Sequence, residues 1–432
     1  MRIKFNQNGF EYITDDTNNI DNNSIFLKTS QNERYFNALE NKPKFLTPIE
    51  LINIWKLRDI KVIGVTGTNG KTTVTASIYS FLLDLDEKPA LQGTRGFFVL
   101  DERVEDKIMT TPSILNTLKH MKIAKEANCN YFIMEVSSHA IEQNRIEDIK
   151  FALKVHTNVT QDHLDYHQTI DEYRRVKSLF FADDTPKLLN KDNIKNITYN
   201  PKNAQSYGVD EPATFKVQAF SLLNGIVAGV KHLQTEATFS SPMIGLFNLF
   251  NLMASIGAVV MATGRRIEDV CTVVENFGGV AGRMEIVSQE PLVVVDFAHT
   301  PDGMYQVLYS IKDRDISVVF GAGGDRDIDK RAKMGAVAGR FAKKIFVTSD
   351  NPRGEVPEMI LEDILIGLRG KENVVATPNR KLAIEMGIDS LEKNGILLIL
   401  GKGDEEYQEI KGVKYPFDDR VVVREILGDK IV

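Results

Sequence analysis

The sequence predicts an α/β protein built from three domains. Its 432 residues are too many for one compact hydrophobic core. From Lys61 onward, short runs rich in β-branched residues alternate with longer helical patterns, and runs such as "YFIMEVSS" and "GILLILG" contain few charged residues. Such runs are typical of strands buried on both faces of a parallel sheet, with crossover helices between them.

Changes along the chain set the expected domain boundaries. The first domain, residues 1–57, is short and ends just after the proline-punctuated stretch "NKPKFLTPIE". The second, residues 58–281, holds the first strand and helix alternation, and its polar segment from about Ala213 to Ser240 is expected to add antiparallel strands. The glycines of "FGGVAGRMEIV" mark the passage to the third domain, residues 282–432.

Composition excludes several classes of partner. A formal net charge of −6 gives no basic field for a polyanion, so we expect no nucleic acid partner. The two cysteines, Cys129 and Cys271, form no CxxC pair, which fits a reducing compartment. The first residues lack the apolar core of a signal peptide, and the apolar runs are too short to span a bilayer. A cytoplasmic protein without a membrane span is expected.

A glycine-rich loop follows the first strand of the second domain, in "GVTGTNGKTTV". Its backbone N–H groups can converge on phosphate oxygens beside a helix N-terminus, with Lys71 reaching the β/γ-phosphates and the Thr72 hydroxyl on Mg²⁺. The general pattern GxxxxGK[ST] requires glycine at position 65, where Val65 stands, so the match is loose. The strand–loop–helix context still predicts a P-loop-like ATPase domain. The expected phosphate-binding residues are Gly67, Thr68, Asn69, Gly70, Lys71, Thr72 and Thr73.

Two other nucleotide-binding classes fit less well. A GTPase needs the base-reading motif NKxD, and "LLNKDN" is one residue short of it. A dinucleotide fold needs GxGxxG, and from Gly321 the pattern "GAGGDRD" places Arg326 where the last glycine belongs.

The order of eight motifs along the chain distinguishes among the classes of nucleotide-binding protein. They are "GTNGKTT", "TTP", "MEVSSHAIEQNR", "TNVTQDHLDYH", "VDFAHTPDGM", "GAGGDRDIDKRAKMG", "TSDNPRGEVPE" and "GKGDEEYQ". Together they resemble the Mur ligases, and most closely the MurE group, which adds the third residue of the peptidoglycan stem peptide. The resemblance runs from about Lys61 to the end and more faintly through the first block. It implies a UDP-binding N-terminal domain, an ATP-binding central domain and a Rossmann-like amino-acid-binding C-terminal domain.

The resemblance implies ATP-dependent amide synthesis through an acyl phosphate on the D-glutamate of UDP-MurNAc-L-Ala-D-Glu. It also implies two Mg²⁺ ions, the first held by Thr72 and Glu135. The second would be held by His163 of "QDHLDYH" and by Lys177 of "EYRRVKSLFF", after Lys177 has reacted with CO₂ to give a carbamate. On the residues alone, Lys177 would be a solvent-facing helix lysine, and carbamate formation needs its neutral amine. The implied catalytic residues are Lys71, Glu135, His163 and Lys177.

Further substrate contacts are implied residue by residue. Those for the UDP-MurNAc-dipeptide are Thr17, Thr110, Thr111, Ser137, Gln143 and Arg145. Those near the adenine and ribose of ATP are Asn248, Asn251, Arg283 and the interdomain contact His299. Asp296 and Asp302 could be neighbours of His299, and roles in a turn and a helix cap fit them equally well. The first block departs from the family by its shortness, with Thr17 of "DDTNN" replacing a uridine-contacting serine.

The stretch "DNPR", from Asp350 to Arg353, predicts meso-diaminopimelate as the added amino acid. Lysine-adding relatives lack this arginine, whereas Arg353 can bind the second carboxylate of diaminopimelate with two parallel hydrogen bonds. Pro352 stiffens the loop. The implied diaminopimelate contacts are Arg326, Asp350, Asn351, Arg353, Gly401 and Glu405, the last pairing with an ammonium.

Two positions near this pocket differ from the family pattern. Gly354 stands where relatives commonly have serine or threonine, and Asp404 where they commonly have histidine. The alternatives left open are a D-Ala-D-Ala-adding Mur enzyme, a folylpolyglutamate synthase, and a nucleotide-dependent switch without catalysis. A monomer is expected.

Overall fold

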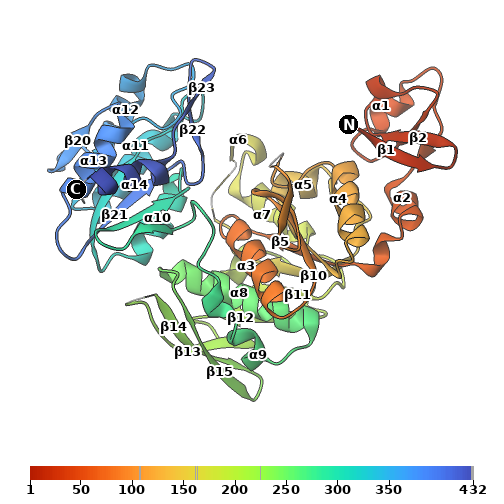
Figure 1. Cartoon of the computed structure of the whole chain (residues 1–432), viewed down its shortest axis with the longest axis horizontal. Coiled ribbons are helices and arrows are strands. Elements are labelled where there is room, and N and C mark those ends of the chain that lie inside the picture. The colour runs from red at the N-terminus through yellow and green to blue at the C-terminus, as the bar shows by residue number, and fades with distance from the viewer. Residues whose placement is uncertain (107–108, 161, 163, 224, 430–432) are drawn as a thin grey trace. The chain divides into compact units, whose positions relative to one another are not determined.

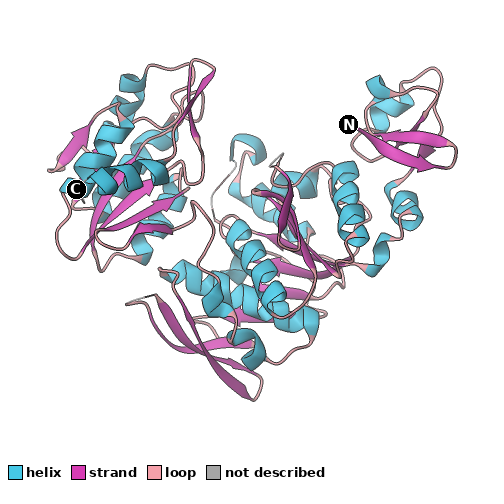
Figure 2. Cartoon of the chain, viewed as in Figure 1, coloured by secondary structure: helices cyan, strands magenta, loops and turns pink. Residues whose placement is uncertain are grey.

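The computed structural model describes residues 1–106, 109–160, 162, 164–223 and 225–429. Figures 1 and 2 show the helices and strands of the chain. It divides into two compact units. The first consists of Met1–Ser221, Val227–Ser241 and Phe250–Phe277, and the second of Leu222–Ile226, Pro242–Leu249 and Gly278–Val432. This division does not test the two boundaries between the three domains expected from the sequence, which stay a prediction.

A small N-terminal sheet begins the first unit. Its strands, in spatial order, are β1 (Arg2–Gln7), β2 (Phe10–Thr14), β3 (Ser24–Leu27) and β4 (Phe45–Leu46). β1 and β2 are antiparallel, and β2, β3 and β4 are parallel. The helices of this part are α1 (Glu33–Asn37) and α2 (Pro48–Ile54). The carboxylate of Glu50 accepts hydrogen bonds from the backbone N–H and hydroxyl of Thr47, 2.8 Å each, which starts α2.

The central sheet of the first unit has eleven strands, in the order β15-β14-β13-β12-β11-β10-β5-β9-β6-β7-β8. They are β5 (Lys61–Thr66), β6 (Pro89–Gly93), β7 (Gly96–Val99), β8 (Glu102–Glu105), β9 (Tyr131–Glu135), β10 (Phe151–His156), β11 (Lys187–Asn190), β12 (Ala204–Gly208), β13 (Phe215–Ser221), β14 (Ile226–His232) and β15 (Thr235–Ser241). The middle of the sheet, from β12 to β6, is parallel, as predicted. β13 and β14 are antiparallel, which confirms the antiparallel addition expected after Ala213.

The helices that accompany this sheet follow the predicted alternation. They are α3 (Lys71–Asp84), α4 (Ile114–Glu126), α5 (Ser138–Glu142), α6 (Leu164–His167), α7 (Ile170–Leu179), α8 (Leu246–Thr263) and α9 (Ile267–Cys271). Among the described residues, α8 is the helix long and apolar enough to cross a membrane by length and composition. Because 67% of it is buried, it is better understood as a core helix.

The second unit is a doubly wound α/β sheet. Its strand order is β16-β17-β21-β18-β19-β20, parallel except for β16. The strands are β16 (Glu285–Ser288), β17 (Leu292–Asp296), β18 (Asp315–Phe320), β19 (Lys344–Val347), β20 (Val374–Ala376) and β21 (Gly395–Leu400). A separate hairpin is formed by β22 (Tyr407–Ile410) and β23 (Val413–Pro416). The helices are α10 (Pro301–Ser310), α11 (Asp329–Phe341), α12 (Pro357–Ile366), α13 (Arg380–Asp389) and α14 (Asp419–Asp429).

Alternate residues of its strands enter two different hydrophobic clusters. Val294 packs in one cluster with Met304 of α10 and Met334 of α11, whereas Val295 packs in the other with Ile384 of α13. Helices therefore cover both faces of this sheet, and the carboxyl ends of its parallel strands are left to loops.

Candidate active site

The phosphate loop connects the end of β5 to the start of α3. Gly70 precedes α3 with φ of +84°, and a Cβ there would lie 2.4 Å from Oδ1 of Asn251. A Cβ at Gly67 would lie 1.8 Å from Oγ1 of Thr157. Only glycine fits either position without a shift, so the glycines predicted from the sequence have a steric reason. The Nζ of Lys71 donates to the carbonyl of Gly67 at 2.8 Å and lies folded over the loop.

The residues after β10 fix the shape of this loop. Asn158 accepts from the backbone N–H of Asn69 at 2.9 Å and donates from Nδ2 to the Asn69 carbonyl at 3.2 Å. The hydroxyl of Thr157 donates to the same carbonyl at 2.6 Å, and the Thr68 N–H donates to the Asn158 carbonyl at 2.8 Å. The turn is thus rigid before any phosphate binds.

Glu135 lies at the carboxyl end of β9, beside the loop, with 1% of its surface exposed. Its Oε2 accepts from the Thr72 hydroxyl at 3.1 Å and from the Thr94 hydroxyl at 3.1 Å, and its Oε1 accepts from the Thr94 N–H at 2.7 Å. A Cβ at Gly93 would lie 2.4 Å from Oε1, so this glycine makes room for the carboxylate. A buried carboxylate beside a hydroxyl is a donor set of the hard oxygens that Mg²⁺ prefers.

The second predicted cation site is only partly described. His163 lies outside the described residues. Among the residues that the structure does describe, no group of three or more His, Cys, Asp or Glu side chains gathers as a metal site. The donors on which a cation site can be argued are therefore Thr72, Glu135 and the side chain of Lys177.

Lys177 of α7 is buried, with 1% exposure, and does not face solvent. Its Nζ donates to Oγ1 of Thr66 at 3.2 Å and to the carbonyl of Gly67 at 3.0 Å, and lies 5.0 Å from the ring centre of Tyr173. Burial lowers the pKa of Lys177 well below its usual value, and the nearby Lys71 cation lowers it further. The neutral amine that carbamate formation requires is favoured here.

Four of the predicted dipeptide contacts, Thr111, Ser137, Gln143 and Arg145, form one connected cluster in the first unit. Arg145 donates from Nη1 to the Thr111 carbonyl at 2.9 Å and from Nη2 to Oε1 of Gln143 at 2.6 Å. The Thr111 hydroxyl donates to the Glu135 carbonyl at 2.9 Å and accepts from the Ser137 N–H at 3.0 Å. The cluster is therefore continuous with Glu135.

The two remaining predicted dipeptide contacts are Thr110, next to this cluster, and Thr17, in the N-terminal part of the unit. The hydroxyl of Thr110 lies 3.1 Å from that of Thr94, which binds Glu135. Thr17 begins a short 3₁₀ turn after β2, and the neighbouring Asp15 accepts a hydrogen bond from Ser113 at 3.1 Å. The segment that carries Thr17 is thus tied to the start of α4.

The residues predicted to bind the amino acid lie in the second unit. The neighbouring strands β21, β18 and β19 are parallel, so their carboxyl ends meet at one edge. Gly401 follows β21, Arg326 lies in the loop after β18, and the "DNPR" stretch follows β19. Gly401 has φ of +113°, and a Cβ there would lie 2.5 Å from Oδ2 of Asp350.

Side-chain contacts join these loops. Asn351 donates from Nδ2 to Oε2 of Glu405 at 2.8 Å. Arg353 donates from Nη1 to the carbonyl of Gly324 at 2.8 Å, and its Nε lies 3.4 Å from Oε2 of Glu409. The guanidinium predicted to bind a substrate carboxylate is therefore fixed to the loop after β18.

Two positions that depart from the family pattern lie in or beside these loops. The N–H of Gly354 donates to Oδ2 of Asp325 at 3.0 Å, and a Cβ at position 354 would lie 3.2 Å from that oxygen. Glycine thus relieves a tight contact. Asp404 is partly buried, and its backbone N would lie 2.1 Å from a Cβ at Gly282.

The predicted nucleotide contacts are divided between the two units. Asn251 lies against Gly70 in the first. In the second, the Asn248 side chain donates to the Ile244 carbonyl at 2.9 Å. The Arg283 guanidinium lies 4.2 Å from the ring centre of Phe297, and the His299 ring lies 4.7 Å from the same ring.

The two aspartates near His299 have local structural roles. Asp296 ends β17 and accepts from the N–H groups of Met284 and Ala298 at 2.8 Å and 2.7 Å. Burial raises the pKa of Asp296. Asp302 lies in the first turn of α10, where a carboxylate favours the helix N-terminus.

Comparison with known proteins identifies the family. The chain matches the Mur ligase middle domain over residues 65–259 and the Mur ligase, glutamate ligase domain over residues 282–403. The UDP-N-acetylmuramoyl-L-alanyl-D-glutamate–2,6-diaminopimelate ligase of Wolinella succinogenes is 50% identical over 431 residues, 99% of either chain. The chain belongs to the Mur ligase family.

Other relatives of this Mur ligase carry the same name. Those of Helicobacter hepaticus and Helicobacter pylori are 46% and 44% identical, cover 94% and 98% of this chain, and are themselves covered over 90% and 97%. A solved structure of a ligase of this name is 28% identical, with a TM-score of 0.70 over 97% of this chain and 95% of its own. Mycobacterium tuberculosis folylpolyglutamate synthase complexed with ADP, 17% identical with a TM-score of 0.64 over 82% of this chain and 91% of its own, shares the fold. The predicted family and fold class are confirmed.

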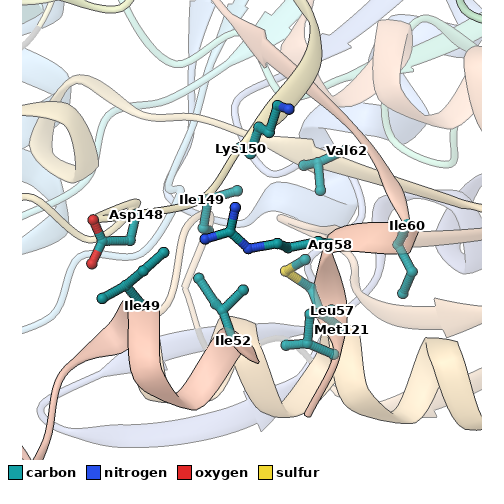
Figure 3. A pocket seen from close by; sticks show the side chains of 10 residues that line it. All are labelled: Ile49, Ile52, Leu57, Arg58, Ile60, Val62, Met121, Asp148, Ile149 and Lys150. Atoms are coloured by element: carbon teal, nitrogen blue, oxygen red, sulfur yellow. The ribbon is translucent and has the colours of Figure 1, made fainter. Parts of the chain in front are cut away.

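The cavity and the groove described in this Mur ligase are lined by residues outside its phosphate loop. A cavity of about 50 Å³ lies at the amino end of β5, between α2 and α4 (Figure 3). Its lining is apolar apart from Arg58, Asp148 and Lys150. An open groove of about 700 Å³ lies between α7, at Arg174 and Leu179, and residues 195–200.

Some residues that shape the site were not predicted. Thr94 holds Glu135, Asn158 holds the phosphate loop, and Glu409 contacts Arg353. Thr94 and Asn158 follow parallel strands at the same sheet edge as Lys71, so the rule that ligand-binding residues follow strand carboxyl ends could have found them. Nothing in the sequence around Glu409 marks it.

Proposed function

We propose that this Mur ligase joins meso-diaminopimelate to the D-glutamate of UDP-MurNAc-L-Ala-D-Glu, converting ATP to ADP and phosphate, in the cytoplasm. The observation that carries the choice of amino acid is Arg353, whose guanidinium is hydrogen-bonded to the Gly324 carbonyl, in the stretch after β19 that also carries Asp350 and Asn351. A guanidinium there suits a second carboxylate on the added amino acid. Neither lysine nor D-Ala-D-Ala carries one in that position. The names of the relatives that match over their full length support the same choice.

In the first step, an oxygen of the D-glutamate side-chain carboxylate attacks the γ-phosphorus and ADP leaves. In the second, the diaminopimelate amine attacks the acyl carbon, phosphate leaves, and the nitrogen loses a proton. The loop N–H groups and Lys71 orient the ATP phosphates. Arg145, Gln143 and Thr111, already joined to one another, orient the dipeptide beside Glu135.

Thr72 and Glu135 would hold one Mg²⁺, and Lys177, as a carbamate, would hold a second together with His163. The ions would neutralise the crowded phosphate and carboxylate oxygens. The buried amine of Lys177 and its lowered pKa support the modification, because CO₂ reacts with the neutral amine only.

The test is phosphate release by the purified protein with UDP-MurNAc-L-Ala-D-Glu, ATP and one amino acid at a time, with the product weighed by mass spectrometry. We expect turnover with meso-diaminopimelate and a product heavier by its residue mass. Turnover with D-Ala-D-Ala or glutamate but not with diaminopimelate would contradict the proposal. Slow ATP hydrolysis that no amino acid accelerates would indicate a nucleotide switch.

A further inference from the structure

A fully buried histidine ends β10, the strand beside β5 and its phosphate loop. His156 has 0% of its surface exposed, and neither of its ring nitrogens has a hydrogen-bond partner among the residues that the structure describes. Burial, and to a smaller extent the nearby Lys177 cation, lowers the pKa of His156 to about 3, so the ring is neutral and one nitrogen carries a hydrogen. A polar group buried without a partner costs stability, so this ring has an N–H donor to offer.

The surroundings of His156 place its ring on the same side of the sheet as the amine of Lys177. His156 is the register partner of Thr66 in the parallel strand β5, and partners in neighbouring parallel strands project from the same face. The hydroxyl of Thr66 accepts a hydrogen bond from Nζ of Lys177 at 3.2 Å. The His156 ring also packs against Phe181, just after α7, with the ring centres 5.9 Å apart. The imidazole and the amine thus share one buried region between β5, β10 and the end of α7.

As an amine, Lys177 leaves the imidazole unpaired. Its Nζ donates to the Thr66 hydroxyl at 3.2 Å and to the Gly67 carbonyl at 3.0 Å, and an ammonium has no acceptor to offer an imidazole N–H. The buried hydroxyl of Tyr207 also contacts this histidine, but it donates to the His156 carbonyl at 3.1 Å. The ring therefore lacks an acceptor for its N–H.

Carbamate formation would supply that acceptor. The neutral Nζ of Lys177 attacks the carbon of CO₂, an electron pair of one C=O bond moves onto oxygen, and the nitrogen loses a proton to water. The product extends the side chain beyond Nζ by two anionic oxygens. A hydrogen bond from an N–H group to an anionic oxygen is stronger than one between neutral groups.

We propose that the imidazole N–H of His156 donates a hydrogen bond to a carbamate oxygen on Lys177, and that His156 is a positioning residue of this site. The inference rests on the proposed function, whose modification of Lys177 it takes further. The hydrogen bond would orient the carbamate and leave its other oxygen for a metal ion. It would also stabilise the modified lysine relative to the amine, so more of the protein carries the carbamate at a given CO₂ concentration.

The test compares the unmodified full-length protein with His156→Phe, which removes both ring nitrogens and keeps an aromatic ring against Phe181. Both proteins are titrated at one pH with ¹³C-labelled bicarbonate, in CO₂-depleted buffer with Mg²⁺, and the carbamate signal is measured by carbon NMR. We expect the bicarbonate concentration at half-maximal signal to rise roughly tenfold or more in His156→Phe, because a hydrogen bond to an anion is lost. The bicarbonate concentration that gives half-maximal turnover should rise by a similar factor.

Thermal unfolding gives a second measurement, which a role in packing alone would not change in this way. The Tm of the unmodified protein should rise with bicarbonate, and this rise should be smaller in His156→Phe, because a group bound more weakly by the folded state stabilises it less. In CO₂-depleted buffer, the Tm of His156→Phe should equal or exceed that of the unmodified protein, because unpaired polar atoms have been removed from a buried site.

Two further variants complete the test. His156→Gln keeps an N–H donor at this position and should recover part of the bicarbonate affinity that His156→Phe loses. His232 ends β14 and stacks on Phe215, with the ring centres 4.1 Å apart. His232→Phe is therefore the same exchange at a stacked histidine in another strand, and it should leave the bicarbonate titration unchanged.

The outcomes separate this inference from the proposed function. An unchanged bicarbonate titration in His156→Phe would overturn the role of His156 and leave the carbamate itself standing. If the unmodified protein gave no carbamate signal at any bicarbonate concentration, both the modification and the role of His156 would be wrong. A different amino acid substrate would overturn the proposed function only, because the carbamate titration is measured without an amino acid.

Discussion

The Nζ of Lys177 donates two hydrogen bonds, to Thr66 and Gly67, in a site closed to solvent. A permanently charged amine would be costly there because neither partner is a carboxylate. Carbamate formation would replace that cation by an anion with two oxygens, next to the Lys71 cation that lowers the pKa of Lys177. The surroundings thus disfavour the ammonium and favour its anionic product.

Lys177→Ala should lower kcat at least about 10²-fold, because an anion that organises the transferring phosphoryl group is removed. Addition of a short-chain carboxylate should restore part of the activity. A carbamate signal should be present in the carbon NMR spectrum of the unmodified protein in ¹³C-labelled bicarbonate, and absent from the variant.

Lys202→Ala is the control for this substitution, since Lys202 is exposed and paired with Asp184. It should change neither turnover nor the NMR signal. Unchanged turnover in Lys177→Ala would refute the modification.

At the scale of elements, the phosphate loop and the start of α3 depend on close contact with the turn after β10. The carbonyl and N–H of Asn158 and the hydroxyl of Thr157 lie where a side chain at Gly67 would go. Two of these three groups belong to the backbone and cannot rotate away.

Gly67→Ala should therefore displace the loop. We expect ATP affinity to fall at least about tenfold and the free energy of unfolding to fall by about 1–3 kcal/mol. Calorimetric titration with ATP and denaturant unfolding measure the two effects. Gly278→Ala, where a Cβ meets nothing within 4 Å, should change neither. Undiminished ATP binding by Gly67→Ala would mean that the loop is not the nucleotide site.

The elements differ in how far the sequence predicts them. The parallel strands and their loops were predictable because an apolar run followed by glycine and polar residues is typical of a buried strand that ends in a loop. The order of strands within a sheet could not be predicted in this way. For example, β21 lies between β17 and β18 although it comes last of the three in the sequence. The contact of Arg353 with Glu409 depends on where a hairpin folds back, and no local pattern encodes it.

At the scale of the whole molecule, the fold class and the three-domain organisation of the family follow from the alternation of strands and helices and from the motif order. The sequence does not predict which parts of the chain share a hydrophobic core. Ile13 and Leu27 of the N-terminal sheet belong to the same hydrophobic cluster as Phe132 of β9 and Val176 of α7. Such packing is set by three-dimensional complementarity, which sequence periodicity does not report.

The phosphate loop belongs to the first unit and the predicted amino-acid-binding residues to the second. The stabilisation by nucleotide and the stabilisation by amino acid should therefore be separable by mutation. A ligand at about 100 times its Kd stabilises the folded state by about 2.7 kcal/mol, a rise in Tm on the order of 5 °C. Thermal unfolding should therefore show a rise with Mg·ADP and a rise with meso-diaminopimelate. Lys71→Ala should abolish the first and keep the second, because Asp350, Asn351 and Arg353 are positioned without the phosphate loop. Arg353→Ala should abolish the rise in Tm with meso-diaminopimelate and keep the rise with Mg·ADP. If either variant lost the rise in Tm with both ligands, the view that the two sites form independently would be wrong.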